Sequence, residues 1–529
     1  MKFILKTSIL FGLSCILFSC TNSSESIQQE DTRPNIIFIM ADDMGYSDLG
    51  YYGSGIETPN LDKLAKEGVL FSQFYNTGRC CPTRATLMTG LYNHQTGMGD
   101  MVQGRNHPNY QGYLNESCIT IAEILKEQDY LTMMSGKWHL GNDPAYWPQK
   151  RGFERFYGIP EGGGVYYYPF RKERNVVLDD EFLQPDSSYY TTTAFSKYAV
   201  QFVEEAKEDD RPFFLYLAHI APHFPLQAPE EVTQKYIGKF MEGFDTLRKN
   251  RLSEIQKKGL LEKQWPLSPA DSMVKEWEAL SEEEKKDYDN KMAIYAAQMD
   301  IMDQGIGDLI QKLEDTGQLD NTIIFFLSDN GGTSEDTSNR YPQLKGEVGS
   351  RDSYLTYGAS WANVSNTPFK YYKSYLYEGG ISTPLIVHSP KRFGQARVEH
   401  KVAHVIDMVP TILELTQSEY PEQRLNVPLP PLPGKSLLPT LKETDQEQNE
   451  ERTLFWEHEG DRAIRKGDWK LVSIYPENQW RLYNLAQDRT ELNDQYEQKP
   501  ELAQELEALY FKWADKTGVV AWEELIGKK

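Results

Sequence analysis

The sequence has 529 residues, of which 39% are hydrophobic and 25% charged, and its formal net charge is -22. Such an acidic surface repels polyanions, which excludes nucleic acid as an expected partner and disfavours densely sulfated polymers unless a basic cluster reverses the local sign. Five cysteines are too few for a disulfide scaffold, and the length allows two or more domains.

The N-terminus predicts export. Residues 1–19 combine Lys2 with an apolar run, a pattern typical of a secretory signal peptide and too short to span a membrane. Ser19-Cys20 at its end resembles the lipobox of bacterial lipoproteins, although ordinary cleavage without a lipid is the alternative. Residues 20–33 are polar and are predicted to be a lipid-tethered spacer. We therefore expect an exported lipoprotein of a Gram-negative bacterium, periplasmic or at the cell surface, that meets the membrane only through its lipid.

Apolar runs alternate with helical patterns along the next part of the chain. The runs are short, continuous and rich in β-branched and aromatic residues, as in strands buried on both faces, and they span 35–40, 212–218, 322–327 and 383–387. Helical patterns cover 60–68, 119–128 and 292–313. This alternation predicts an α/β fold in which helices cover a large, mostly parallel sheet.

The rest of the chain suggests further divisions. Residues 34–448 are predicted to form one domain, in which the strongly charged segment 231–290 is a solvated helical insertion. A proline-rich stretch at 427–433 suits a linker or surface loop. Short strands and turns after Arg452, with an amphipathic helix near the end of the chain, predict a small C-terminal α+β domain over residues 449–529.

Polar residues follow two of the predicted strands. Asp42 and Asp43 end the first strand, and Ser328, Asp329 and Asn330 follow the run 322–327. In parallel sheets, sites form beyond the carboxyl ends of the strands. Crowded carboxylates repel one another, and an oxygen-ligated cation such as Ca²⁺ or Mg²⁺ removes that conflict. The alternative is that each pair only caps a turn.

Two adjacent cysteines precede a predicted short helix. Pro82 and Thr83 can begin a helix that ends at Gly90, and the N-terminus of a helix favours an anion. Arg84 adds a forked set of donors one turn later. Cys80 is therefore predicted to lie at an anion-binding position, and the alternative is a turn that holds an inert buried thiol.

These residues carry a specific resemblance. The run Cys80-Cys81-Pro82-Thr83-Arg84 with the later Thr89-Gly90 is similar to the signature of the type I, formylglycine-dependent sulfatase family of the alkaline phosphatase-like superfamily. The resemblance extends from about Arg33 to the C-terminus, is strongest to the arylsulfatase branch, and includes 136–141, 221–225, 328–331 and 373–380. One departure is Ser382, where many members carry arginine. The family implies a large mixed, mostly parallel sheet sandwiched by helices, with a smaller C-terminal domain.

The resemblance also implies a modification and a metal. A sulfatase-maturating enzyme would oxidise Cys80 to formylglycine (3-oxoalanine), and Cys81 would only fill a variable position. A Ca²⁺ ion, with Mg²⁺ less expected, would be held by Asp42, Asp43, residue 80, Asp329 and Asn330. From the residues alone, a bridge between Cys81 and Cys118 stays open.

Roles in catalysis follow from the same resemblance. The aldehyde hydrate at position 80 would attack sulfur with help from Asp329, and His139 would take the proton whose loss expels sulfate. His223 and Lys373 would protonate the departing oxygen. The sulfate oxygens would be held by Arg84, Lys137 and Lys373. Two neighbours of these residues in the sequence, Arg79 and Glu335, are predicted to contact substrate.

Three functions are compatible with the sequence. The first is hydrolysis of a sulfate monoester, either a carbohydrate sulfate such as a galactose sulfate or an aryl sulfate. The second is hydrolysis of a phosphonate or phosphodiester by the same superfamily. The third is a silent binding protein in which Cys80 stays unmodified.

Overall fold

A computed structural model describes residues 33–527, apart from 169, 171–173, 262–264, 342, 345 and 445–450. The predicted signal peptide and nearly all of the spacer lie outside these residues, and so does the predicted domain boundary at 448/449. From Arg33 onward the chain forms one compact unit. Within the described residues, none of the helices has the length and apolar character needed to cross a membrane.

The centre of the molecule is a large mixed sheet, which in the described part of the chain has 11 strands. In spatial order the strands are β10 (Arg397–Glu399), β2 (Val69–Tyr75), β9 (Ser382–His388), β8 (Thr322–Ser328), β1 (Asn35–Asp42), β7 (Phe213–Pro222), β3 (Leu131–Lys137), β4 (Arg155–Ile159), β5 (Val176–Leu178) and β6 (Glu181–Leu183), and β11 (Ala403–His404) also pairs with β2.

The middle of this sheet is parallel. β1 pairs in parallel with β7 and β8, and β3 pairs in parallel with β7 and β4. β9 runs antiparallel to both β8 and β2. The predicted α/β fold with a mixed, mostly parallel sheet is therefore confirmed.

Side chains of β1 alternate between two cores on opposite faces of the sheet. Ile37 and Ile39 belong to one buried cluster, and Ile36, Phe38 and Met40 belong to the other. Continuous apolar strands of this kind need helices on both faces of the sheet, because an uncovered face would expose every second apolar side chain to water.

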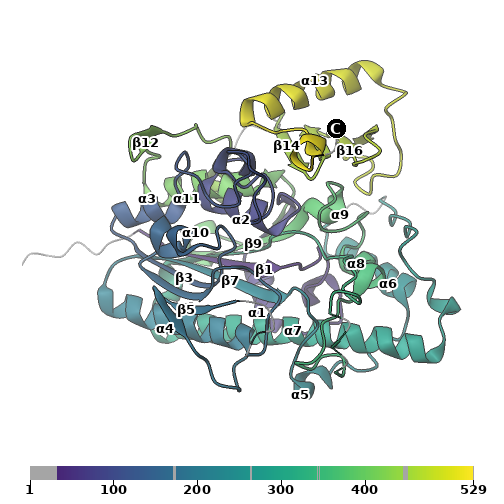
Figure 1. The fold of residues 1–529 in the computed structure, drawn as a ribbon, viewed down its shortest axis with the longest axis horizontal. Coiled ribbons are helices and arrows are strands. Elements are labelled where there is room, and N and C mark those ends of the chain that lie inside the picture. Colours follow the sequence, from purple (N-terminus) through teal and green to yellow (C-terminus); the bar gives the residue numbers. More distant parts are fainter. Residues whose placement is uncertain are drawn as a thin grey trace, which may run out of the picture. The chain divides into compact units, whose positions relative to one another are not determined.

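Helices provide that cover (Figure 1). One face carries α1 (Pro59–Glu67), α4 (Thr191–Asp209) and α7 (Glu282–Asp315), and the other carries α2 (Cys80–Thr89), α3 (Ile121–Glu127) and α11 (Met408–Thr416). The remaining α-helices are α5 (Glu230–Thr233), α6 (Phe244–Lys257), α8 (Gly358–Ser365), α9 (Glu378–Ile381), α10 (Pro390–Phe393), α12 (Leu438–Leu441) and α14 (Trp522–Leu525).

The segment 231–290 differs from the predicted solvated insertion. It contributes Phe240, Phe244 and Ile255 to the larger core cluster, and the Arg251 side chain is buried with its guanidinium 2.8 Å from Asp48. The many charged residues of the segment obscure this pattern in the sequence. Phe244 and Ile255 of α6, and Phe240 just before it, pack against the sheet domain. The segment is part of the domain core rather than an appendage.

The C-terminal part is an antiparallel sheet beneath a helix, as predicted. Its strands and helix are β14 (Thr453–His458), β15 (Asp461–Lys466), β16 (Trp469–Ser473), β17 (Trp480–Asn484) and α13 (Pro500–Thr517), and a separate small hairpin is formed by β12 (Gln423–Arg424) and β13 (Val427–Pro428). The core under α13 also contains Tyr75, Tyr92 and Tyr377 of the preceding domain. The two parts therefore share one hydrophobic cluster.

Candidate active site

The predicted acids meet at the carboxyl ends of β1 and β8. These strands pair residue for residue up to Ala41 and Ser328, so that Asp42 and Asp329 come next to each other. The Asp43 amide donates a hydrogen bond of 3.2 Å to Asp329 Oδ1. All of the predicted metal-binding side chains at this edge are buried.

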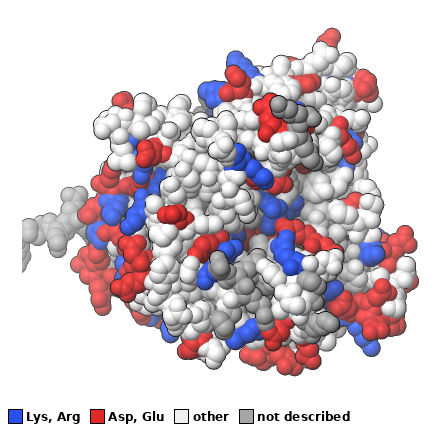
Figure 2. Space-filling model, in the orientation of Figure 1, with Lys and Arg blue, Asp and Glu red and all other residues white. Residues whose placement is uncertain are grey.

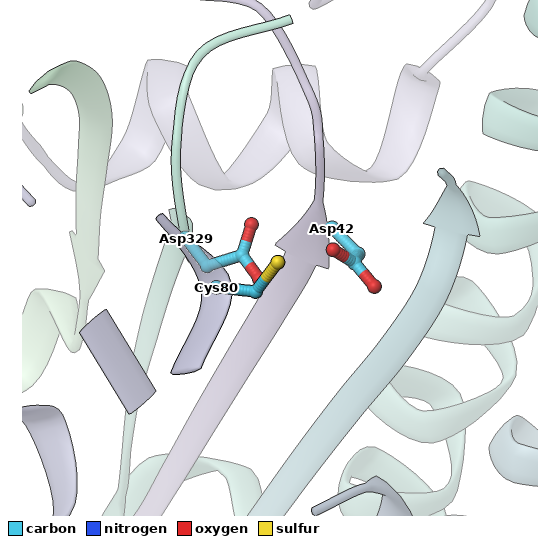
Figure 3. A group of neighbouring side chains, drawn as sticks. All are labelled: Asp42, Cys80 and Asp329. Carbon is cyan, nitrogen blue, oxygen red and sulfur yellow. The ribbon is translucent and has the colours of Figure 1, made fainter. Parts of the chain in front are cut away.

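Helix α2 brings Cys80 to the acids. The helix begins at Cys80, two residues before the predicted start, and the Thr83 hydroxyl donates a 2.7 Å hydrogen bond to the carbonyl of Asp329. Ligand atoms of Asp42, Cys80 and Asp329 all lie within 4.8 Å of one another (Figure 3). Burial raises the pKa of the Cys80 thiol, although Lys137 and Lys373 act in the opposite direction. The thiol is therefore protonated at neutral pH.

Two cationic side chains, Arg84 and Lys137, neutralise the acids. Arg84 donates to Asp329 Oδ2 from Nε at 3.1 Å and from Nη2 at 2.7 Å. Lys137 Nζ donates to Asp42 Oδ2 at 2.6 Å. Burial and the nearby Asp42 carboxylate raise the pKa of Asp329 to about 6, even though Arg84 lowers it.

Asp43 joins a second group of predicted residues. Lys373 Nζ lies 2.7 and 2.8 Å from its two carboxylate oxygens, and Asn330 Nδ2 donates to Oδ1 at 2.7 Å. His223 Nε2 lies 3.6 Å from Asp43 Oδ2. Burial alone would raise the pKa of Asp43, but Lys373 and His223 hold it well below its usual range.

The two predicted histidines are uncharged. Burial lowers the pKa of His223 to about 3, and its Nδ1 lies 2.5 Å from the carbonyl oxygen of Phe224. Burial, together with Lys137 and Arg84, lowers the pKa of His139 well below its usual range. Its Nδ1 has no hydrogen-bond partner among the described residues. Both rings are therefore neutral at pH 7.

The two predicted substrate contacts lie beside these groups. Arg79 Nη1 is 3.7 Å from Glu335 Oε1, and Lys373 Nζ is 3.8 Å from the same oxygen. Arg79 also hydrogen-bonds Ser374. The structure thus gathers every residue that the sequence predicted for the site.

The oxygen-rich part of the site fits a hard cation. Asp42 Oδ1 and Asn330 Oδ1 are buried, and within the described chain neither has a hydrogen-bond partner. A buried oxygen without a donor costs free energy, and a divalent cation with carboxylate and amide ligands removes that cost. The residues present therefore match Ca²⁺ chemistry.

Known proteins place the chain in a family. The Sulfatase family model matches residues 34–418, and the model for the N-sulphoglucosamine sulphohydrolase C-terminal region matches residues 369–513. The chain belongs to the sulfatase family. It is therefore a sulfuric ester hydrolase, and the predicted family and enzyme class are confirmed.

Relatives of this sulfatase cover nearly all of its length. An uncharacterized sulfatase of Schizosaccharomyces pombe is 35% identical and covers 93% of this chain and 95% of its own. An arylsulfatase of Klebsiella aerogenes is 33% identical, and the match covers 82% of this chain and 96% of that protein. The crystal structure of Ps i-CgsB has a TM-score of 0.69, 28% identity, and 91% and 93% coverage, and its complex with k-i-k-neocarrahexaose has a TM-score of 0.68.

Some residues that build the site were not predicted. The hydroxyl of Tyr216 lies 3.5 Å from Arg84 Nη1, and Gly162 leaves room for His139, whose ring would lie 2.6 Å from a Cβ at that position. Neither has a signal in the sequence, because a strand tyrosine and a loop glycine are common everywhere. In this sulfatase Cys81 and Cys118 are free, so the bridge that the sequence left open is absent.

Proposed function

We propose that this sulfatase hydrolyses sulfate monoesters of carbohydrates, with Cys80 converted to formylglycine and Ca²⁺ as cofactor. One observation carries the proposal: three acids and three cations, from five separate places in the sequence, surround the side chain of Cys80. A carbohydrate is favoured over an aryl group because Ps i-CgsB, which covers most of this chain, binds a neocarrahexaose. The sequence resemblance favoured an arylsulfatase, and aryl sulfates remain the alternative substrate.

The carboxylates and the amide would hold the ion. Asp42 Oδ1 and Asn330 Oδ1 are buried oxygens without a donor among the described residues, and Asp43 and Asp329 would complete the set. When present, the hydrated aldehyde supplies an oxygen nucleophile and Ca²⁺ neutralises negative charge on oxygen. Mg²⁺ fits less well, because it demands a stricter octahedral geometry than a site of protein oxygens offers.

The side chains of the protein would divide the remaining work. Lys373 keeps its proton, since Asp43 raises its pKa against the effect of burial, and we assign to it the protonation of the leaving oxygen. We assign the acceptance of the proton to His139, which is neutral and whose Nδ1 has no hydrogen-bond partner among the described residues. Arg84 and Lys137 would bind sulfate oxygens and spread charge as it develops on them. Neutral His223 would orient the leaving oxygen rather than supply the proton.

The mass of the peptide that contains residue 80 tests the proposal. Conversion of cysteine to formylglycine lowers this mass by about 18 Da. We expect the lower mass in active enzyme, no turnover by Cys80→Ala, and nearly full turnover by the control Cys81→Ala. Active enzyme with an unmodified cysteine would refute the proposal, and faster turnover of a phosphodiester than of a sulfate monoester would favour the phosphodiesterase alternative.

We also propose that the enzyme is exported and held by a lipid on Cys20, as its N-terminal sequence indicates. The variant Cys20→Ala should move the enzyme from the membrane fraction to the soluble fraction. Unchanged membrane association would refute the lipid anchor. A sulfatase-maturating enzyme in the same host is the partner that the modification requires.

A further inference from the structure

A second group of polar side chains lies outside the catalytic set. Ligand atoms of Asp100, His458 and Glu459 are all within 4.8 Å of one another. The His458 side chain is fully buried, and neither of its ring nitrogens has a hydrogen-bond partner in the part of the chain that the structure describes. Asp100 Oδ1 is equally buried and unpartnered, while Arg105 Nε holds Oδ2 at 2.6 Å.

Such a group calls for a ligand. Buried polar atoms in native proteins nearly always have hydrogen-bond partners, and each one left without a partner costs free energy. Three such atoms in one place, beside a partly exposed Glu459, indicate a position that a bound molecule completes.

Two contacts hold this group against the catalytic segment. Trp456 Nε1 donates a 2.8 Å hydrogen bond to the carbonyl of Asn76, four residues before Cys80. His94 Nε2 lies 2.6 Å from Glu457 Oε2, which is a buried contact with the segment that follows α2. Residues on both sides of the reactive position therefore fix β14 in place.

Arg79 connects the group to the catalytic site. Burial lowers the pKa of His458 and the positive charge of Arg79 adds to this effect, while Glu459 is among the acidic groups that raise the pKa of Arg79 against burial. The Arg79 guanidinium also contacts Glu335 and Ser374, next to Lys373. In Figure 2, basic and acidic side chains gather in a hollow between β14 and the ends of the central strands. The group thus borders the place where a substrate must enter.

The turn between β14 and β15 presents Glu459 at a conformational cost. His458 and Asp461 pair across the hairpin, which leaves Glu459 and Gly460 as its two turn residues, with φ of 50° and 92°. Turns with two positive φ values favour Asn, Asp or Gly, and other residues are strained there. A glutamate retained at such a position is consistent with a function for its carboxylate.

The chemistry of the group selects one kind of ligand. Two carboxylates accept hydrogen bonds, a neutral imidazole can donate one and accept one, and Arg79 donates. Neighbouring hydroxyl groups on a neutral ring satisfy all of these. A second sulfate would be repelled by the carboxylates, and an unsubstituted aryl ring would leave them unpaired.

We propose that Asp100, His458 and Glu459, together with Arg79, form a subsite that binds ring hydroxyls of the sugar whose sulfate is cleaved. The subsite would discriminate sugar sulfates from aryl sulfates, and it rests on the proposed function. A site of this kind rejects analogues that lack the hydroxyls, because its buried polar groups are then left unpaired.

The test compares two substrates in purified enzyme with residue 80 converted. For Asp100→Asn, His458→Gln and Glu459→Gln, kcat/KM is measured with the best of a panel of sulfated monosaccharides and with 4-nitrophenyl sulfate. We expect the ratio of the sugar value to the aryl value to fall by at least about tenfold. Glu477→Gln is the matched control, since Glu477 is exposed in the next hairpin and pairs with Arg481, and it should leave the ratio unchanged.

Several results would overturn the subsite. An unchanged ratio in all three variants, or an equal loss on both substrates, would contradict it. Loss of one equivalent of bound metal from the variants, measured by elemental analysis, would identify a second cation site instead. A wild-type enzyme that turns over only aryl sulfates would refute the subsite together with the proposed carbohydrate substrate, whereas an unchanged ratio in an enzyme that cleaves sugar sulfates would refute the subsite alone. If no sulfate ester is turned over, the proposed function fails and the subsite fails with it.

Discussion

At the scale of single residues, the site balances charges that could not be buried alone. Asp42 is paired with Lys137, and Asp329 is paired with Arg84, yet Asp42 Oδ1 keeps no donor among the described residues. The two cations therefore neutralise the acids without saturating them. The carboxylate oxygens that face Cys80 can therefore still bind a further positive charge.

Removal of Ca²⁺ should show what the ion contributes beyond the neutralisation of the acids by Lys137 and Arg84. We expect a chelator to abolish turnover and to lower the melting temperature, because the carboxylates of Asp42, Asp43 and Asp329 would face one another with less neutralising charge. Ca²⁺ should restore activity more fully than Mg²⁺ at equal concentration. Turnover and thermal unfolding are measured on the same sample. Full activity and an unchanged melting temperature after exhaustive dialysis against the chelator would contradict the metal assignment.

Ser382 illustrates how a departure from the family pattern is accommodated. Its hydroxyl donates a 3.0 Å hydrogen bond to Glu378 Oε2, and Arg489 Nε donates to the same oxygen at 3.1 Å. A guanidinium is thus supplied from the C-terminal part of the chain, next to the position where many family members carry arginine. The sequence gives no sign of this exchange, because more than a hundred residues separate the partners.

At the scale of elements, loops after the strands set the positions of the catalytic rings. Gly162 has a φ of 110°, and a Cβ there would lie 2.6 Å from the His139 ring. Gly162→Ala should therefore displace His139 and lower kcat by about tenfold or more, since small misplacements in an active site are costly. Gly317→Ala is the control, because Gly317 has a φ of 70° but nothing within 4 Å. Equal, small effects of both variants on kcat would contradict this role of Gly162.

Elements differ in how well the sequence predicted them. The strands β1 and β8 were predicted from their continuous apolar runs, and because each run ends in an acid, parallel topology brings Asp42 and Asp329 together. The contacts of Asp100 with the β14–β15 hairpin could not be predicted, because they depend on how a distant antiparallel sheet docks. The burial of segment 231–290 was missed because its charges outnumber the apolar residues that α6 turns inward.

At the scale of the whole molecule, a buried ion cluster joins the C-terminal sheet to the loop that carries Lys373. Lys470 Nζ lies 3.0 Å from Glu378 and 2.8 Å from Glu491, and all three side chains are fully buried. Burial would raise the pKa of Glu378, but Lys470 and Arg489 lower it to about 2. Burial raises the pKa of Glu491 to about 7, although Lys470 lowers it. Two carboxylates therefore share one ammonium, and Glu378 stays ionised at pH values at which Glu491 takes up a proton.

Substitution of Glu378 and of Glu491 should affect the stability of the protein differently. Glu378→Gln leaves buried cations without their anion and should lower the free energy of unfolding by about 3–5 kcal/mol. Glu491→Gln imitates the protonated form. Protonated Glu491 adds to the free energy of unfolding of the wild-type protein. This stabilisation is lost as pH rises from 4.5, the ordinary pKa of a glutamate, toward 7. The melting temperature of Glu491→Gln relative to wild type should therefore rise across that window. A difference that stays constant or falls with pH would contradict the assignment.

The surface as a whole opposes the charge of the substrate. Acidic side chains are frequent along the rim of the face in Figure 2, basic and acidic side chains lie together in its central hollow, and the net charge is -22. An anionic sulfate ester is repelled at long range and attracted only near the site. The Debye length falls from about 30 Å at 0.01 M salt to about 10 Å at 0.1 M, so added salt screens the distant rim more than the short contacts at the site.

Rates at different ionic strengths test which charge governs the approach of substrate. We expect kcat/KM for a monosulfated sugar to rise as salt increases from 0.01 M to about 0.1 M, and to rise more steeply for a disulfated sugar, because repulsion scales with substrate charge. Choline as the added cation avoids competition with Ca²⁺. A fall in kcat/KM with salt would mean that the cations of the hollow, rather than the acidic rim, control encounter with the substrate. In that case, reversal of exposed acids such as Glu497→Lys should leave the rate unchanged. Under control by the acidic surface, the same reversal should accelerate turnover of the disulfated sugar more than that of the monosulfated one.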